Sequence, residues 1–326
     1  MPDRVLSGMQ PSGRLHLGNF LGALDNWQRL QETHECFFFV ADWHALSTNY
    51  ADTSQVKTFT YEVLIDWLAA GIDPERSTVF VQSHVPEHAI LYLLFSMMTP
   101  IPWLERNPTY KEKQEYLTDR DLSTYGFLGY PVLQAADILL YKPDAVPVGK
   151  DQLPHLELTR EIARRFNSLY QPVFPEPKEL LTSFPKVLGT DGKKMSKSYG
   201  NTINLSDQEP VVRQKLKTMV TDPARVKRTD PGNPDICPVF DFHRIFSPLP
   251  IIDQVNQECR TAEIGCVQCK AFAAGAIVAR LAPLWETRAA LEAHPKRIED
   301  VIHHGCQKAS RVAHDTLEEA KKAMKI

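Results

Sequence analysis

The pattern of apolar and polar positions predicts a chain in which short strands alternate with helices. Apolar runs rich in β-branched or aromatic residues lie at residues 5–7, 37–41, 78–82 and 145–148. Runs of this length are typical of strands buried on both faces. Longer segments with helical spacing separate them, at residues 21–30, 56–70, 88–98 and 153–166. This alternation predicts an α/β fold: a doubly wound parallel sheet with helices on both faces.

The pattern changes after Gly200. The sequence beyond it shows no convincing buried-strand pattern, and residues 298–324 repeat apolar residues at helical intervals. The full length of 326 residues is enough for two domains with substantial cores. We therefore expect a nucleotide-binding domain over residues 1–200 and a helical domain over residues 201–326.

Composition favours a soluble protein. The chain is 43% hydrophobic and 24% charged, which is ordinary for a globular protein. Its sequence has no apolar stretch long enough to span a bilayer and no signal-peptide pattern, so we expect a cytoplasmic protein with no membrane partner. The net charge of −3 does not favour nucleic acid, but residues 213–228 hold six basic residues and one acid. That stretch indicates either a solvated helix face or a local surface for RNA.

A first candidate motif follows the first predicted strand. Gly8-Met9-Gln10-Pro11-Ser12-Gly13 leads into His16-Leu17-Gly18-Asn19. A strand, a turn rich in small residues and a helix start form a geometry in which backbone N–H groups face a phosphate. Alone, this pattern is equally consistent with an ordinary strand–helix turn.

A second candidate motif, Lys194-Met195-Ser196-Lys197-Ser198, follows Thr190-Asp191-Gly192-Lys193. Two lysines separated by small residues can neutralise charge that builds on a leaving pyrophosphate. A solvated basic loop is the alternative. The two motifs together are far more specific than either alone.

At these residues the chain resembles the class I aminoacyl-tRNA synthetases, whose ATP-binding motifs are usually written HIGH and KMSKS. Leu17 and Asn19 replace the second and fourth residues of the first motif, a form usual in the tryptophan-specific enzymes of bacterial type. Asp42-Trp43-His44-Ala45, residues 130–141, residues 146–152 and residues 155–160 continue the resemblance. The segment 101–123 resembles the insertion that connects the two halves of the sheet in this family.

The resemblance implies roles for individual residues. It assigns catalysis to His16, Asn19, Lys194 and Lys197. It assigns ATP binding to Gln10, Pro11, Ser12, Gly18, Asn19, Lys113, Gly149, Lys150, Asp151, Val187, Lys194, Met195, Ser196, Lys197 and Ser198. It assigns tryptophan binding to Leu6, Ser7, His44, Tyr130, Gln134, Asp137, Val146, Val148 and Gln152. Mg²⁺ would accompany ATP, tRNA(Trp) would be the second substrate, and the enzyme would be a homodimer.

Asp137 is notable for its surroundings as well. It lies in a helix-like run of Ala, Ile and Leu, where an unpaired carboxylate is costly to bury. One hypothesis is that it accepts the indole N–H, because phenylalanine would leave such an acceptor unpaired and be rejected without editing. The alternative is a structural Asp bonded to backbone.

Four of the six cysteines fall in one part of the chain: Cys237, Cys259, Cys266 and Cys269. Thiols in a Cys-x-x-Cys pair with two further cysteines suit a tetrahedral zinc ion or an iron–sulfur cluster, and unligated thiols are the third possibility. The arrangement is similar to that of a subset of tryptophanyl-tRNA synthetases with a [4Fe–4S] cluster in the anticodon-binding domain. Cys36 and Cys306 lie outside this group and are typical of buried thiols.

Two alternative functions stay open. A tyrosyl-tRNA synthetase shares both motifs, but its pocket should offer partners for a phenol O–H. A redox-sensing or RNA-binding protein on a synthetase scaffold would use the cysteines, but would not need both lysines of residues 194–198. The favoured hypothesis is an enzyme that forms tryptophanyl-adenylate from tryptophan and ATP and transfers the tryptophan to tRNA(Trp).

Overall fold

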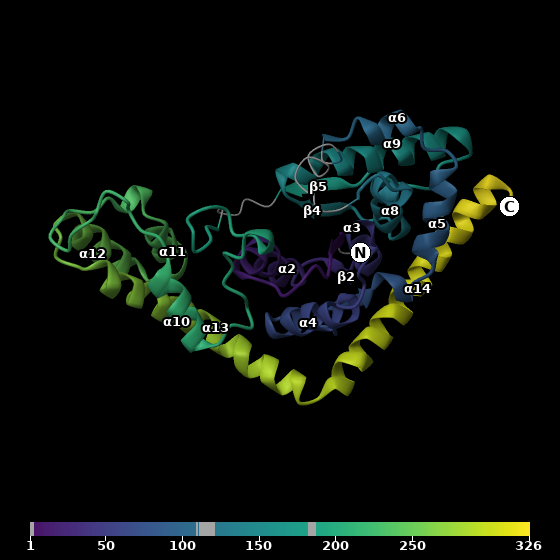
Figure 1. Ribbon diagram of the computed structural model, residues 1–326. Helices are drawn as coiled ribbons and strands as arrows, with labels where there is room; N and C mark the ends of the chain where they lie inside the picture. The colour runs from purple at the N-terminus through teal and green to yellow at the C-terminus, as the bar shows by residue number, and fades with distance from the viewer. Residues whose placement is uncertain (1–2, 109, 111–120, 182–186) are drawn as a thin grey trace.

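The computed structural model describes residues 3–108, 110, 121–181 and 187–326 (Figure 1). Its sheet has five parallel strands in the order β3-β2-β1-β4-β5. The strands are β1 (Arg4–Met9), β2 (Glu35–Val40), β3 (Ser77–Val81), β4 (Ala145–Val148) and β5 (Lys178–Leu181). The strand order reverses direction at β1 and β4, as in doubly wound nucleotide-binding folds. The predicted fold class is confirmed.

Alternate residues of β1, β2 and β3 enter two separate cores. Phe38 and Val40 of β2 face a core that includes buried residues from 63–67 and 273–291. Phe37 and Phe39 face a second core, which includes buried residues from 91–95, 132–141, 156–166 and 309–323. Side chains of a strand alternate between the two faces of its sheet, so a strand with apolar residues at every position is covered on both sides. The continuous apolar run of β2 reflects this double burial.

The helices fill the connections between strands and the whole region after β5. Before β5 they are α1 (Leu17–Asn19), a π-helical turn (Phe20–Leu24), α2 (Asp25–Leu30), α3 (Asp42–Asn49), α4 (Val56–Ala69), α5 (Glu87–Ser96), α6 (Ile101–Glu105), α8 (Tyr125–Leu140) and α9 (Leu153–Leu169). After β5 they are α10 (Glu209–Thr218), α11 (Pro238–Phe246), α12 (Leu249–Arg260), α13 (Cys266–Glu292) and α14 (Pro295–Met324). In the described part of the chain no strand follows Leu181.

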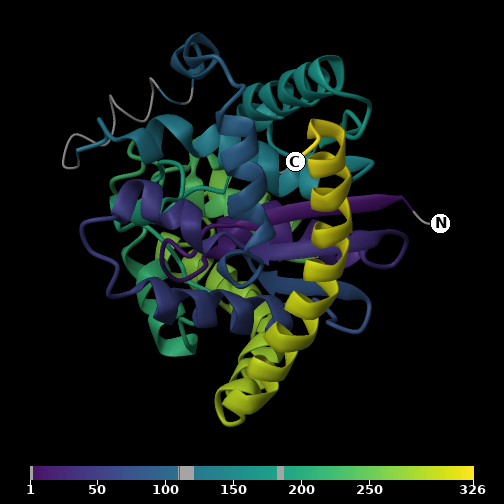
Figure 2. The same cartoon turned by 90° about the vertical axis from the view of Figure 1, so that its right-hand side faces the viewer.

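The two longest helices, α13 and α14, run back along the nucleotide-binding sheet (Figures 1 and 2). α13 is long and apolar enough to cross a membrane by length and composition. It packs against α4, α10 and α11, however, and carries a buried arginine, Arg288. In the apolar window 33% of the residues are buried, and those on the packed side, such as Ala273, Ile277 and Leu281, belong to a protein core.

α14 crosses the edge of the sheet at Gly305. Ile298 and Ile302 belong to the core on one face, and Ala309 and later residues belong to the core on the other face. A Cβ at Gly305 would lie 1.7 Å from the carbonyl oxygen of Val79 in β3. A side chain larger than hydrogen is therefore excluded where the helix covers the edge strand.

Candidate active site

β1 and β4 lie side by side where the strand order reverses, and we call the region outside their carboxyl ends the crevice. Gln10 and Ser12 follow β1, and Gly149 and Asp151 follow β4. In open parallel sheets ligands bind outside the carboxyl ends of the strands, where the strand order reverses. Most residues predicted to bind ATP therefore lie at the place where the fold itself favours a nucleotide.

The turn after β1 is shaped by its glycines and by His16. Gly13 has φ +127°, a conformation that L side chains rarely adopt. His16 caps α1, and its backbone N–H donates to Asn19 Oδ1 at 3.1 Å. A Cβ at Gly18 would lie 2.9 Å from the His16 ring, so a glycine at this position leaves room for the imidazole.

Lys197 of the second motif contacts this turn, although it lies 184 positions after Gly13 in the sequence. Its Nζ donates to the carbonyl oxygen of Gly13 at 2.9 Å and lies 3.4 Å from Ser12 Oγ. Burial lowers the pKa of Lys197 to about 8. Burial, reinforced by the charge of Lys197, lowers the pKa of His16 to about 4. At neutral pH the site therefore combines a neutral imidazole with a lysine that is mostly charged.

Asn201, a residue that sequence reasoning missed, holds the loop that carries Lys197. The Asn201 side chain accepts from the Ser196 N–H at 2.8 Å and donates to Asp191 and to the Lys194 carbonyl at 2.7 and 3.1 Å. The Met195 N–H donates to the Val187 carbonyl at 2.9 Å. A Cβ at Gly18 would also approach Val187 to 4.0 Å, so the predicted ATP residues of both motifs lie together.

Asp137 is at the centre of a buried hydrogen-bond network. Its Oδ1 accepts from Gln82 Nε2 at 2.7 Å and from His88 Nδ1 at 2.6 Å, and its Oδ2 lies 2.7 Å from His44 Nε2. Burial opposes ionisation, but His44 and His88 lower the pKa of Asp137 to about 2. His88 also contacts the Tyr141 hydroxyl at 2.8 Å. The predicted carboxylate is present and charged, held by two residues, Gln82 and His88, that sequence reasoning missed.

The predicted amino-acid pocket continues from His44 to β4. Tyr130 lies edge-on to His44, with ring centroids 6.5 Å apart, and its hydroxyl lies 2.8 Å from His155 Nε2. His155 Nδ1 in turn lies 3.1 Å from Gln152 Oε1. The apolar members Leu6, Val146 and Val148 are all buried in the core on this face. Ser7 and Gln134 are half-buried.

The remaining predicted ATP residues differ in exposure. Lys150, Asp151, Lys194 and Ser198 are exposed, and Pro11 is buried. A Cβ at Gly149 would lie 2.6 Å from Asp151 Oδ1, so a side chain there would displace the exposed Asp151 carboxylate. Lys113 lies outside the described residues.

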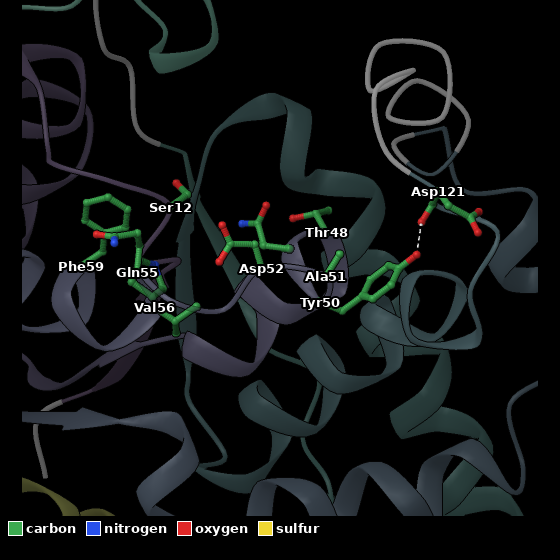
Figure 3. Close-up of a pocket in the computed structure, with 11 residues that line it drawn as sticks. Ser12, Thr48, Tyr50, Ala51, Asp52, Gln55, Val56, Phe59 and Asp121 are labelled. Atoms are coloured by element: carbon green, nitrogen blue, oxygen red, sulfur yellow. Dashed lines mark hydrogen bonds between the residues drawn. The ribbon is translucent and has the colours of Figure 1, made fainter.

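A cavity of ≈ 590 Å³ lies beside this site (Figure 3). Ser12 of the first motif forms one side, the connection between α3 and α4 another, and Asp121 a third. The Tyr50 hydroxyl donates to the Asp121 carbonyl at 3.1 Å across it. Thr48, Asp52 and Gln55 give the lining a mixed polar character. The crevice thus has a polar space that adjoins the first motif.

The four predicted metal ligands lie near one another. Burial raises the pKa of Cys269 to about 12, and the thiols of Cys237, Cys259 and Cys266 add to this increase. Cys259 Sγ lies 3.6 Å from Arg225 Nη1, and Cys269 Sγ lies 3.4 Å from His243 Nε2. Among the described residues, however, no group of three or more ligating side chains is arranged to hold a metal ion.

Comparison with known proteins decides the family. The model of the family described as tRNA synthetases class I (W and Y) matches residues 2–282. The chain belongs to this family. It is 54% identical to the tryptophan–tRNA ligase of Thermotoga maritima over 325 residues, covering 99% of both chains, and 44% identical to that of Aquifex aeolicus, covering 99% and 100%. The structure of Campylobacter jejuni tryptophanyl-tRNA synthetase complexed with ADP and tryptophan matches with a TM-score of 0.91 and 32% identity, covering 99% and 100% of the two chains.

These relationships confirm the predicted enzyme: an aminoacyl-tRNA synthetase that activates tryptophan with ATP and charges tRNA. The tyrosine-specific enzyme and the non-catalytic scaffold are not favoured. ATP-dependent activation by such an enzyme implies Mg²⁺ as the partner of ATP.

Proposed function

We propose that the crevice between β1 and β4 forms tryptophanyl-adenylate and then transfers the tryptophan to tRNA(Trp). The observation that carries this proposal is the hydrogen bond from Lys197 Nζ to the Gly13 carbonyl, because it brings the two ATP motifs into one site. The test is exchange of labelled pyrophosphate into ATP with each of the twenty amino acids in turn. Tryptophan alone should support exchange at a substantial rate, and equal exchange with tyrosine would contradict the proposal.

The first step needs positioning and charge stabilisation. A carboxylate oxygen of tryptophan attacks the α-phosphorus of Mg·ATP, a new P–O bond forms, and the bond to pyrophosphate breaks. Lys194 and Lys197 take up the negative charge that develops on pyrophosphate. His16 and Asn19 contact phosphate oxygens, and the glycines of both turns let the backbone approach the nucleotide. No side chain has to form a covalent intermediate.

Selectivity for tryptophan rests on Asp137. A carboxylate offers about four lone-pair positions. Oδ1 accepts from two side chains and Oδ2 from one, which leaves a position on the Oδ2 side, next to His44. An indole N–H that occupies this position completes the network. Leu6, Val146 and Val148 pack against the ring, and Tyr130, Gln134 and Gln152 hold the α-amino end.

In the second step a hydroxyl of the 3′-terminal ribose of tRNA attacks the acyl carbon of the adenylate, and AMP leaves. The cavity beside Ser12 provides the space through which this ribose reaches the adenylate. The helical region over residues 201–326 binds the anticodon end. Two neighbouring pockets support this: one is lined by Arg225, Lys227 and Arg228, and the other by Arg213, Lys217 and Lys270. Clustered basic residues are the usual electrostatic footprint of RNA binding.

The four cysteines of this region would come together to hold a metal centre, with a [4Fe–4S] cluster preferred and Zn²⁺ as the alternative. The donor chemistry fits, because four thiolates suit either. Gly232 adds room, since a Cβ there would lie 2.6 Å from Cys259 Sγ. Arg225 beside Cys259 offsets thiolate charge. The centre would hold the loops around the basic pockets, far from the adenylation chemistry. The enzyme would act as a homodimer in the cytoplasm.

A further inference from the structure

Arg288 of α13 forms a buried link between the helical region and the nucleotide-binding domain. Its side chain is 5% exposed and donates to Asp66 and Glu62, both on α4. Its Nε also lies 3.0 Å from Glu292. A buried arginine with a fork of donors is expensive to place and needs several acceptors to offset the loss of hydration. A buried ion-pair cluster of this kind is therefore more informative about function than an exposed ion pair would be.

Asp66 connects this arginine to the ATP motifs. It is 0% exposed, and burial raises its pKa to about 7 despite Arg288 beside it. The acidic pair on α4 reaches the first motif directly, because Arg14 Nε, one residue after Gly13, lies 3.9 Å from Glu62 Oε2. The backbone N–H of Leu15, the residue before His16, lowers the pKa of Asp66, and the charge of Asp66 in turn raises the pKa of Lys197. Among the described residues Asp66 Oδ2 has no hydrogen-bond partner of ordinary length. One oxygen of Asp66 is thus bound to Arg288, while the carboxylate also acts on the turn that carries His16 and on Lys197.

We propose that Asp66, held in place by Arg288, is a positioning residue for adenylate formation. The inference rests on the proposed role of Lys197. Glu62, the second acceptor of Arg288, contacts Arg14 in the turn of the first motif, and the Asp66 carboxylate attracts the Leu15 N–H and the Lys197 ammonium. The acidic pair on α4 therefore holds this turn and the lysine in the relation seen in the structure. Without Arg288, a carboxylate this deeply buried takes up a proton and loses both attractions. Arg288 acts on the reaction through Asp66 and does not touch the nucleotide.

Arg280 provides a matched comparison on the same helix. It also reaches from α13 to the nucleotide-binding domain, where its Nη2 lies 3.3 Å from Asp25 Oδ1 and its guanidinium lies over the Phe20 ring. Its side chain is 49% exposed, however, and exposed ion pairs contribute little. Loss of Arg280 therefore removes a contact between the same two regions without touching Asp66.

The test compares Arg288→Met, Arg288→Lys, Arg280→Met and the double variant Asp66→Leu/Arg288→Met. Pyrophosphate exchange gives kcat and the KM values for ATP and tryptophan, and thermal unfolding reports stability. We expect kcat in Arg288→Met to fall about 10- to 100-fold, the scale on which misplaced catalytic groups slow a reaction, with the KM for tryptophan unchanged. Arg288→Lys should recover part of the rate, and Arg280→Met should stay within about two-fold of the wild type.

The double variant separates positioning from stability. It leaves no unpaired charge at Asp66, so it should regain the stability that Arg288→Met loses and should fold even if the single variant does not. Under the proposal kcat stays low although the stability returns. Recovery of kcat together with stability would show that the pair is merely structural, and a normal kcat in Arg288→Met would also overturn the proposal. Wild-type exchange with tryptophan tests the proposed function separately.

Discussion

Lys197 Nζ donates a hydrogen bond of 2.9 Å to the carbonyl oxygen of Gly13, a residue 184 positions earlier in the chain. Glycine suits this position because its φ of +127° is one that L side chains rarely adopt, and a Cβ there would lie 3.3 Å from Lys197 Cδ. Two motifs that look independent in the sequence therefore share one pocket. Lys197 is consequently the residue whose substitution gives the clearest information about the chemistry.

We expect Lys197→Ala to lower kcat for adenylate formation by roughly 10²- to 10³-fold, the effect of losing one preorganised charge-stabilising group. Pyrophosphate exchange at saturating ATP and tryptophan measures it. Lys193→Ala is the control, because Lys193 is an exposed lysine of the same loop. If the KM for ATP rises while kcat holds, Lys197 contributes uniform binding and does not act on the transition state.

The activity should also depend on the charge of Lys197. Burial lowers its pKa to about 8, so the ammonium is present below this pH and lost above it. We therefore expect kcat/KM for ATP, which reports the free enzyme, to fall as the pH rises through about 8. Lys197→Arg keeps its charge to much higher pH and should shift this fall upward. A wild-type profile that stays flat to pH 10 would contradict the assignment.

Asp137→Asn should weaken both tryptophan use and selectivity. An asparagine places an amide N–H donor opposite either Gln82 and His88 or His44, where the carboxylate has an acceptor. With the amide nitrogen on the His44 side, it no longer offers an acceptor to the indole N–H. We expect a reduced kcat/KM for tryptophan and a loss of about 1–3 kcal/mol in discrimination against phenylalanine. Unchanged kinetics with tryptophan in the folded variant would contradict the proposal that Asp137 binds tryptophan.

Cys266→Ser should disturb tRNA charging or stability but leave pyrophosphate exchange largely intact. Cys306→Ser is the control, because Cys306 lies on α14, outside the four-cysteine group. Anaerobically purified wild type should contain about four iron and four sulfide per chain. One zinc per chain would make the centre a zinc site and leave the rest unaffected. Loss of pyrophosphate exchange in a Cys266→Ser variant that remains folded would contradict the proposal that the metal centre is separate from adenylate formation.

The sequence predicted those parts of the fold that have a strong local signal. β1 to β4 are apolar runs, and each was expected within a few residues of its observed bounds. β5 was missed because Lys178–Leu181 is an exposed edge strand with little apolar character. α3 was missed because its segment, Asp42–Asn49, has almost no apolar periodicity. β5 is a strand because it pairs with β4, and its own residues do not indicate that pairing.

The candidate site shows the same division. Motifs with a distinctive order of residues, such as residues 194–198, could be recognised as candidate site residues from the sequence. Gln82, His88 and Asn201 could not, because their importance comes from partners that are distant in the chain or bonded through backbone atoms. Asp66 and Arg288 are separated by 222 positions, and each is an ordinary charged residue of a helix until folding brings them together.

The contact between Gly305 and Val79 also bears on the order in which the molecule is made. β3 is an edge strand, and its backbone is covered by α14, which the ribosome produces long after the sheet residues. Until then a nascent chain exposes an apolar strand with free hydrogen-bonding groups, the kind of edge that recruits other chains. The helix that completes the sheet thus also ends the period in which the new enzyme is most prone to aggregate.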